Sequence, residues 1–425
     1  MTEPIQPVRG MNDVLPAEDP YWERVESVAA ELFASYGYRR IRIPVLERTE
    51  LFKRSIGEHT DIVEKEMYTF EDRNGESVTL RPEATAGVVR AGLSNGLLHN
   101  QQQKLWCSGP MFRREKPQKG RYRQFHQLSV EALGFADPEV DAELIAMTAR
   151  LWRALGIASV KLEINTLGTP ESRAGYRQAL VEYFSARRDA LDEDSLRRLE
   201  RNPLRILDSK NPAMRPLIDA APELTGYLDA PSRAHFERVQ ALLAAVGIPF
   251  EVNVRLVRGL DYYTHTVFEW LTDRLGAQSA VCAGGRYDGL VAQLGGQPTP
   301  AVGFALGIER VIELMRAEGV EVPERPLDVF VVAVGEEARR HAFALVERLR
   351  DQLPGVAFGM GGWSAGFKAQ LKRADKSGAR YALIVGDDEA AAGVASLKPL
   401  REDAPQERLA PDALAQRLGA VTRPA

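Results

Sequence analysis

The sequence predicts a mixed α/β (α+β) protein with two or three domains. Its 425 residues are more than a single domain usually contains. Hydrophobic residues make up 44% of the chain and charged residues 27%, which is typical of soluble globular proteins. Up to about residue 320, segments with the apolar spacing of helices are mixed with short segments of alternating polarity. Beyond that point strands and helices alternate, as in a separate small α/β domain.

Composition and charge exclude several classes of protein. No apolar run is long enough to span a bilayer, and the N-terminus, MTEPIQPVRG, lacks the apolar core of a signal peptide. The two cysteines, Cys107 and Cys282, can form neither a disulfide framework nor a metal cluster. The formal net charge of −4 argues against a generally basic surface, so any RNA contact must come from local patches. We therefore expect a cytoplasmic protein without a membrane segment.

The chain begins with a predicted helix and strand. Residues 16–36 carry apolar side chains at helical spacing, and Gly37 ends the pattern. Residues 40–43 then alternate as a strand that stops at Pro44. Residues 78–80 form the next predicted strand.

The stretch after residue 80 predicts the start of another helix. Pro82 fits the first helical position, and Glu83 falls in the first turn, where an acidic side chain favours the helix dipole. This structural role explains Glu83 without any ligand, and a role in ligand binding is equally compatible with the pattern.

Residues 111–131, MFRREKPQKGRYRQFHQLSVE, predict a β-hairpin around a loop with Pro117 and Gly120. Period-2 alternation places Arg113 and Glu115 on one face of the first strand. On the second strand one face carries four residues: Phe125, Gln127, Ser129 and Glu131. Between residues 113 and 123 the hairpin has one acid, Glu115, and six cations: Arg113, Arg114, Lys116, Lys119, Arg121 and Arg123.

Two interpretations of this hairpin are open. Lysine and arginine are common on solvated edge strands, where they block further strand pairing. The face that should point inward is also polar, however, which makes a poor core and a good ligand face. Arginine forks suit phosphate oxygens, and an aromatic ring can stack on a base.

A second helical section follows. Asp137 and Pro138 start a helix with an apolar stripe that Gly156 closes, and residues 160–164 alternate as a strand. Residues 169–248 are charge-rich and helical, and most of these charges are expected to be solvated.

Strand character returns at residues 252–256, and Arg258 and Gly259 lie where this strand would break. Tyr262, Tyr263 and His265 follow. Arg258 alone could be an ordinary surface arginine. No His or Cys cluster has metal-ligand spacing, so His265 and Cys282 are not expected to bind zinc.

The last part of this section combines a strand and a helix. Residues 300–306 alternate, and residues 308–315 carry a helical apolar stripe. Arg310 lies in the first turn of this helix, where it could form a surface salt bridge with Glu309 or meet an anionic ligand.

The C-terminal section begins after a proline-containing stretch, residues 319–326, that predicts a linker. It contains a buried strand (327–334), an amphipathic helix (336–353) and another strand (381–385). A later helix places three lysines on one face: Lys368, Lys372 and Lys376. Such a face is usually solvated, and it can also contact phosphates.

Taken together, these motifs resemble the histidyl-tRNA synthetases among the class II aminoacyl-tRNA synthetases. Residues 111–131 resemble motif 2, the helix and strand at residues 16–44 resemble motif 1, and the strand and helix at residues 300–315 resemble motif 3. TLRPEATAG (79–87) is similar to the histidine-binding stretch of the family, although the family usually has glycine where Ala84 stands. LVRGLDYYTHTVFEW (256–270) and AGGRYD (283–288) resemble the two histidine-specific signatures. The resemblance covers essentially the whole chain in order.

The resemblance implies a domain organisation and an assembly. It implies a catalytic domain on an antiparallel sheet flanked by helices, a helical insertion and a C-terminal α/β anticodon-binding domain. The corresponding ranges are 1–168 and 249–320 for the catalytic domain, 169–248 for the insertion, 321–326 for the linker and 327–425 for the anticodon-binding domain. Since the motif 1 proline lies at the dimer interface in the family, it also implies a homodimer.

The activity implied is that of a histidine–tRNA ligase, which uses ATP with Mg²⁺, L-histidine and histidine tRNA. The implied catalytic residues are Arg113 and Arg258. Histidine binding is implied for Glu83, Thr85, Arg113, Gln127, Glu131, Arg258, Tyr262 and Tyr263. ATP binding is implied for Arg113, Glu115, Arg121, Phe125 and Arg310. The lysines 368, 372 and 376 become candidates for tRNA contact, and no metal site is implied from protein side chains alone.

Two alternatives belong to other functional classes. One is a non-catalytic regulatory paralogue of the ATP phosphoribosyltransferase complex, which typically lacks the C-terminal domain and loses signature residues. The other is an RNA-sensing module of the kind fused to a kinase. Here Arg113, Glu115, Arg258 and Arg310 are present, residues 327–425 follow, and no kinase sequence accompanies them.

Overall fold

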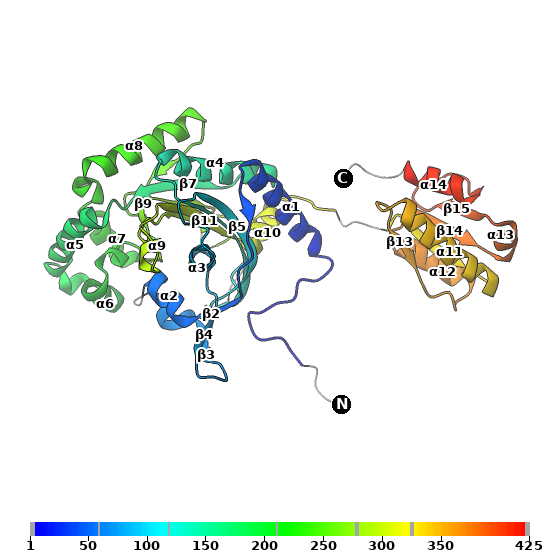
Figure 1. The fold of residues 1–425 in the computed structure, drawn as a ribbon, viewed down its shortest axis with the longest axis horizontal. Helices are drawn as coiled ribbons and strands as arrows, with labels where there is room; N and C mark the ends of the chain where they lie inside the picture. Colours follow the sequence, from blue (N-terminus) through cyan, green and yellow to red (C-terminus); the bar gives the residue numbers. More distant parts are fainter. Residues whose placement is uncertain are drawn as a thin grey trace. The chain divides into compact units, whose positions relative to one another are not determined.

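The computed structural model describes residues 5–57, 60–117, 120–209, 211–276, 280–323 and 327–420. The chain divides into two compact units, Met1–Val322 and Pro323–Ala425 (Figure 1). Part of the predicted linker, positions 324–326, and Lys119 of the basic loop lie outside the described residues. The finer division of the first unit into a catalytic domain and an insertion stays a prediction.

An eight-stranded sheet is the centre of the first unit. Its strands follow the order β1-β5-β6-β11-β10-β9-β7-β8. Neighbouring strands from β5 to β7 are antiparallel, whereas the two outermost pairs, β1 with β5 and β7 with β8, are parallel. The strands are β1 (Arg39–Arg40), β5 (Gln103–Phe112), β6 (Gln124–Leu133), β7 (Lys161–Thr166), β8 (Glu251–Val252), β9 (Thr264–Leu271), β10 (Ala280–Arg286) and β11 (Ala301–Gly307).

Helices cover both faces of this sheet (Figure 1). On one face, α1 (Asp19–Ser35), α4 (Pro138–Ala154), α8 (Ala230–Ala245) and α10 (Ile308–Ala317) bury their apolar stripes in one core. On the other face lie α3 (Thr85–Ser94) and α9 (Leu290–Gln293), which share a second core. The prediction of a sheet flanked by helices is confirmed.

The predicted hairpin forms between β5 and β6, which pair from Gln103 with Leu133 to Phe112 with Gln124. Alternation on β6 is as predicted. Leu128, Val130 and Ala132 enter the core under α1 and α4, so the residues between them face α3. The prediction for Arg113 and Glu115 was wrong: β5 ends at Phe112, so both lie in the connecting loop. Their loop is held by other segments, since the Arg114 N–H donates to the Glu66 carbonyl at 2.7 Å.

A three-stranded sheet, β2-β4-β3, extends from the first unit below the main sheet in Figure 1. It consists of β2 (Leu46–Arg48), β3 (Tyr68–Glu71) and β4 (Ser77–Leu80), and it is joined by α2 (Thr49–Ile56) and a π-helical turn, Ile62–Glu66. The strand predicted at 40–43 is shorter than expected, because pairing stops at Arg40 after two residues. Pro82 does not begin a helix either, since α3 begins at Thr85.

Residues 170–245 are mainly helical, as predicted. They contain α5 (Pro170–Ser185), α6 (Glu193–Arg201), α7 (Arg215–Asp219) and α8, with 3₁₀ turns at Arg188–Ala190, Pro203–Ile206, Pro212–Met214 and Leu224–Tyr227. Three of these helices start in the same way, because the side chain before the helix accepts a hydrogen bond from a serine N–H three residues later. These caps are Thr169, Asp192 and Asp229. The strand predicted at 252–256 was placed too late, since β8 ends at Val252.

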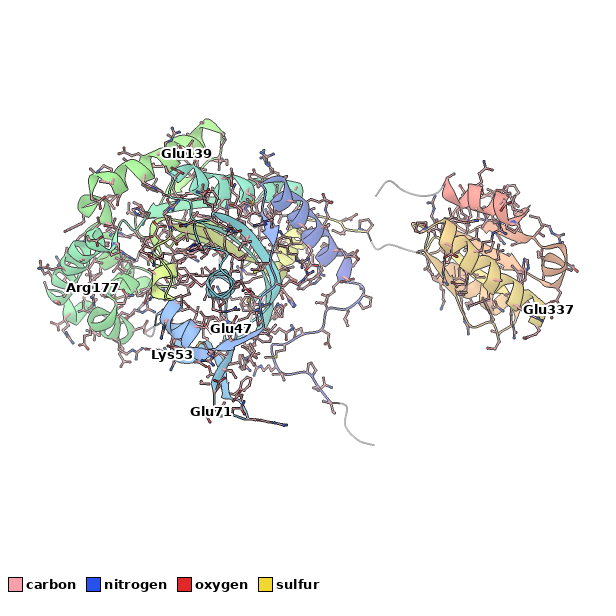
Figure 2. All side chains as sticks on the ribbon, in the orientation of Figure 1. Glu47, Lys53, Glu71, Glu139, Arg177 and Glu337 are labelled. Atoms are coloured by element: carbon pink, nitrogen blue, oxygen red, sulfur yellow. The ribbon has the colours of Figure 1, made fainter. Side chains whose placement is uncertain are left out.

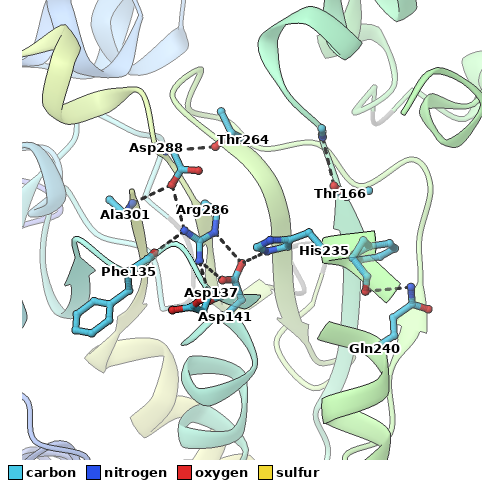
Figure 3. A network of polar contacts seen from close by, with 12 residues as sticks. Phe135, Asp137, Asp141, Thr166, His235, Gln240, Thr264, Arg286, Asp288 and Ala301 are labelled. Atoms are coloured by element: carbon cyan, nitrogen blue, oxygen red, sulfur yellow. Dashed lines mark hydrogen bonds and ion pairs between the residues drawn. The ribbon is translucent and has the colours of Figure 1, made fainter. Parts of the chain in front are cut away.

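Side chains fill the space between the sheet and its helices (Figure 2). At the rim, Glu139 of α4 pairs with Arg238 of α8 at 2.8 Å, and both are about half exposed. A buried ion pair ties the same region to the sheet (Figure 3): Arg286, at the end of β10, pairs with Asp141 of α4, and each side chain is 1% exposed. His235 of α8 also contacts the Asp141 carboxylate, at 3.3 Å.

The second unit has a five-stranded sheet in the order β13-β12-β14-β15-β16. Its strands are β12 (Val329–Ala333), β13 (Phe358–Met360), β14 (Tyr381–Val385), β15 (Ala395–Pro399) and β16 (Glu407–Leu409). Its helices are α11 (Glu336–Gln352), α12 (Phe367–Lys376), α13 (Asp387–Ala392) and α14 (Pro411–Gly419). The predicted strands and helices of this section are present, and the three lysines on α12 are exposed. None of the helices in the described residues is long and apolar enough to cross a membrane.

Candidate active site

A cavity of about 240 Å³ opens on the α3 face of the main sheet. Its walls come from β6, β10 and β11, from the start of α10, and from the loops around residues 113–122 and 258–263. Eleven of the predicted site residues line it: Glu83, Thr85, Arg113, Glu115, Arg121, Phe125, Gln127, Arg258, Tyr262, Tyr263 and Arg310. Residues separated by more than 200 positions in the sequence therefore meet in one site.

Cations concentrate at one end of the cavity. Arg121 pairs with Glu115 at 2.8 Å, and Arg113 lies 3.8 Å from the same carboxylate. The Arg113 guanidinium also lies over the Phe125 ring, 5.3 Å from its centre. Burial, followed by the nearby charge of Arg121, lowers the pKa of Arg310 to about 10, so this side chain is still cationic at neutral pH. These groups form an arginine-rich wall beside an aromatic ring.

The Glu309 carboxylate binds His126 and not Arg310, so the salt bridge considered from the sequence is not formed between these two described residues. Both oxygens of Glu309 accept the backbone N–H of His126, at 2.9 and 3.0 Å, and one also contacts the His126 ring. Arg310 instead donates its Nε–H to the Ala280 carbonyl at 2.9 Å. Its guanidinium is thereby fixed at the cavity wall.

Arg258 enters the cavity from another side. It lies in a loop six residues after β8, where its guanidinium forms an ion pair with Glu269 of β9. The guanidinium is 5.8 Å from the centre of the Tyr263 ring. Tyr262 and Tyr263 contact each other, with ring centres 4.7 Å apart, and burial raises the pKa of both. This wall is aromatic and neutral apart from the Arg258–Glu269 pair.

Glu83 is buried and lies two residues before α3 rather than in its first turn. Its carboxylate accepts the backbone N–H groups of Thr85, at 2.6 Å, and Ala86, at 2.9 Å. It therefore caps the N-terminus of α3 from a position before the helix. The N-terminus is the end of the helix dipole that favours an acid. Burial nevertheless raises the pKa of Glu83, and the two N–H groups only partly oppose this effect.

Glu131 is the one predicted residue of the first unit that does not line the cavity. It lies directly behind the wall, 1% exposed, where Thr85 donates its hydroxyl to one oxygen at 2.6 Å and Tyr287 donates to the other. Burial raises the pKa of Glu131 to about 8. Gly303 of β11 makes room for it, because a Cβ there would approach the Glu131 oxygen to 1.9 Å.

Comparison with known proteins gives the family. A family model described as histidyl-tRNA synthetase matches residues 10–311, and one described as anticodon binding domain matches residues 328–420. The chain belongs to the histidyl-tRNA synthetase family. It is 58% identical over 405 residues to a histidine–tRNA ligase of Halorhodospira halophila, covering 95% of both chains. It is 56% identical to a histidine–tRNA ligase of Alkalilimnicola ehrlichii, covering 98% of this chain and 97% of the relative.

A solved structure agrees with this assignment. The apo histidyl-tRNA synthetase of S. aureus matches 98% of this chain, and all of that chain is covered. The TM-score is 0.83 and the sequence identity is 37%. The resemblance predicted from the motifs is therefore confirmed for the family and for its fold.

Sequence reasoning missed three residues that shape the site of this synthetase: Glu269, Tyr287 and Glu309. Glu269 is the partner of Arg258, and Tyr287 is a partner of Glu131. Tyr287 and Glu269 each lie within one of the two histidine-specific runs, AGGRYD and LVRGLDYYTHTVFEW. These runs marked the segments but did not indicate that Tyr287 contacts Glu131 or that Glu269 pairs with Arg258.

Proposed function

We propose that this protein is a histidine–tRNA ligase. It activates L-histidine with ATP to histidyl-adenylate and transfers the histidyl group to the 3′ end of histidine tRNA, releasing AMP and diphosphate. The observation that carries the proposal is the cavity that joins an arginine-rich wall to a pocket of carboxylates and tyrosines. Similarity to histidine–tRNA ligases over nearly the whole chain, at 56–58% identity, supports this function over that of the regulatory paralogue.

The arginine-rich wall suits the first step. Histidine's carboxylate attacks the α-phosphorus of ATP, a bond to the carboxylate oxygen forms, and the bond to the diphosphate breaks. The carboxylate is already ionised at neutral pH, so no general base is needed. The protein must place charge around the phosphates and align the reactants. Arg113 and Arg258 flank the α-phosphate, Arg121 and Arg310 hold the β- and γ-phosphates, and Phe125 stacks on adenine.

The opposite pocket suits histidine. Glu83 and Thr85 bind its ammonium group, and Gln127 binds the carboxylate region. Tyr262 and Tyr263, with Glu131 behind them, frame the imidazole. Because these groups are buried, an apolar amino acid would leave them without hydrogen-bond partners and would be rejected. Glu131 acts at least partly through Thr85 and Tyr287, which contact both oxygens of its carboxylate.

ATP is expected to bring Mg²⁺, which usually takes one or two protein carboxylates together with phosphate oxygens. Glu115 and Glu269 both line the cavity, each beside an arginine, and would supply oxygen ligands of the required kind. Bound there, the ion would neutralise triphosphate charge that the arginines leave uncompensated.

Transfer requires contacts beyond the cavity. The second unit would bind the anticodon region of tRNA, with the exposed lysines 368, 372 and 376 as phosphate contacts. Residues 169–248 would act as an insertion domain between the two parts of a catalytic domain. The chain would work as a homodimer in the cytoplasm, where its substrates are found. Exposed apolar residues near the motif 1 proline support the dimer: Val45, Leu46 and Phe70 are 37%, 41% and 49% exposed.

Amino-acid-dependent ATP–diphosphate exchange tests the activity. Each of the standard amino acids is supplied in turn, without tRNA, and we expect exchange with histidine. Charging of histidine tRNA is then measured with the same protein. Exchange with another amino acid would contradict the substrate, and absence of exchange with all of them would favour the regulatory paralogue.

A further inference from the structure

The loop at residues 255–263 carries four of the residues that line the cavity, yet it has no regular secondary structure of its own. Its Arg258, Tyr262 and Tyr263 must nonetheless be held in place if they are to bind a substrate. The contacts that hold this loop come largely from the helical segment 170–227, which lies outside the cavity.

Arg205, at the 3₁₀ turn after α6, makes the contact nearest to the chemistry. Its guanidinium donates to the backbone carbonyl of Arg258 at 2.9 Å. The Arg205 side chain is only 17% exposed, and its other nitrogen lies 3.9 Å from Asp61, beside the π-helical turn. Arg205 therefore bridges two loops that border the cavity without lining it.

Other contacts repeat this arrangement along the loop. Asn202 donates to the Asp261 carboxylate at 3.1 Å, and Arg173 of α5 donates to the Tyr263 carbonyl at 2.7 Å. At the start of the loop the direction reverses: Arg255 extends into the helical segment and donates to the carbonyls of residues 219, 221 and 222 at 2.8–2.9 Å. Each end of the loop and its centre are thus bound to the same segment.

The chemistry of these bonds favours a positioning role. A guanidinium that donates to a carbonyl forms a charge-assisted hydrogen bond, and several such bonds fix backbone geometry more tightly than packing alone. Arg258 and Tyr263 are exposed to the cavity through their side chains while their carbonyls are bound from behind. The segment therefore determines where the Arg258 guanidinium and the Tyr263 ring lie.

We propose that Arg205 and Arg173 are positioning residues for amino-acid activation, so that the helical segment contributes to the first chemical step in the absence of tRNA. This inference rests on the proposed function and adds to it a part for residues that do not line the cavity. Displacement of a substrate-holding group by about 1 Å can cost on the order of 100-fold in rate. We expect the loss to appear in the rate of activation, through Arg258, and in the use of histidine, through Tyr263, more than in the affinity for ATP.

Arg205→Ala in the full chain tests the proposal. Histidine-dependent ATP–diphosphate exchange is measured without tRNA, and the histidine KM should rise with kcat/KM falling about 10- to 100-fold. Arg205→Lys keeps one donor and should recover part of the loss. The matched control is Arg197→Ala on α6, where Arg197 is 65% exposed and pairs with Asp194, and it should behave like the parent.

A double-mutant comparison separates positioning from general loss of structure. If Arg205 acts through Arg258, then Arg205→Ala should cost much less in an Arg258→Ala background than in the parent. Parent-like histidine kinetics in Arg205→Ala, or an equal cost in both backgrounds, would overturn the proposal. If Arg205→Ala yields too little folded protein, Arg173→Gln and Arg205→Lys undergo the same comparison. Failure of the parent itself to exchange with histidine would instead contradict the proposed function, and it is seen before any variant is made.

Discussion

Glu83 and Glu131 show how different hydrogen-bond partners act on the pKa of two buried glutamates. Both are buried beside the cavity. Glu83 accepts two helix N–H groups, which favour its ionised form, whereas Glu131 has two hydroxyl partners and a pKa raised to about 8. At neutral pH the free protein therefore keeps Glu131 largely protonated. Burial thus raises the pKa of both carboxyl groups beside the cavity, and Glu131 ionises close to physiological pH.

The raised pKa of Glu131 predicts a pH dependence of stability. The ordinary pKa is 4.5, so between about pH 4.5 and 8 the folded state binds more protons than the unfolded state. Stability should therefore fall as pH rises through this window, by at most about 1.4 kcal/mol per pH unit. We expect the melting temperature of the parent to fall relative to that of Glu131→Gln between pH 5 and pH 8. Parallel curves for the two proteins would show that Glu131 is ionised throughout.

Arg258 is the residue on which the proposed activation step most depends. Negative charge gathers on the α-phosphate oxygens in the transition state, and a fixed guanidinium stabilises it more than it stabilises bound ATP. We expect Arg258→Ala to slow adenylate formation by about 10²–10³, equivalent to about 2.7–4 kcal/mol, with little change in ATP affinity. Arg258→Lys should recover part of this loss.

Single-turnover measurements can separate a loss in adenylate formation from a loss in transfer to tRNA. Transfer from preformed adenylate to tRNA should suffer less, because charge then develops at the carbonyl. Arg274→Ala is the control, since Arg274 follows β9, is 60% exposed and does not line the cavity. Adenylate formation at the parent rate in Arg258→Ala would show that another group faces the α-phosphate.

At the scale of elements, local patterns predicted the strands well and their ends poorly. Alternation on β6 placed Phe125 and Gln127 on the cavity side, because one buried face fixes the register of a strand. Pro82 was placed too early in a helix, because Glu83 caps α3 from outside through side-chain contacts that no propensity encodes. The loop with Arg113 looked like a strand, yet its N–H groups bind residues as distant as Glu66.

The lysine face of α12 gives a prediction at this scale. If lysines 368, 372 and 376 contact tRNA phosphates, replacing all three with alanine should weaken tRNA binding and flatten its salt dependence. Each lost contact should reduce the slope of log K against log salt by about 0.7–0.9. Arg340→Ala on α11 is the control, because Arg340 is 71% exposed on the same unit. Equal salt slopes for the triple variant and the parent would assign this face another role.

For the whole molecule, the sequence predicted the family and a separate C-terminal α/β unit. It did not predict the contacts between distant segments. Arg205 and Arg258 are 53 positions apart, and nothing in either local sequence indicates that one donates to the carbonyl of the other. Such bonds depend on how helices pack against the sheet. For the same reason the partner of Arg258, Glu269, could not be identified from its own strand.

Assembly gives a further prediction for the whole molecule. The exposed apolar residues around β2 and β3 would be covered in a dimer, so light scattering of the parent should give twice the mass of one chain at micromolar concentration. Leu46→Asp should weaken this dimer, because a charge would be buried without a partner. Phe343→Asp is the control, since Phe343 is 53% exposed on α11. A monomeric parent would exclude the proposed dimer.

The buried pair of Arg286 and Asp141 has a consequence for how this protein can change over time. Loss of Asp141 leaves Arg286 with Asp288 at 3.2 Å, and loss of Arg286 leaves Asp141 with His235. Breaking a buried pair in this way typically costs about 3–5 kcal/mol, out of a total stability of about 5–15 kcal/mol. A lineage that loses only one of the two residues therefore comes close to unfolding, whereas joint replacement by apolar residues can be nearly neutral. His235 contacts the same carboxylate, so a change at position 141 also affects what can stand at position 235. Across diverging descendants, we expect positions 141 and 286 to be exchanged together, with position 235 following them.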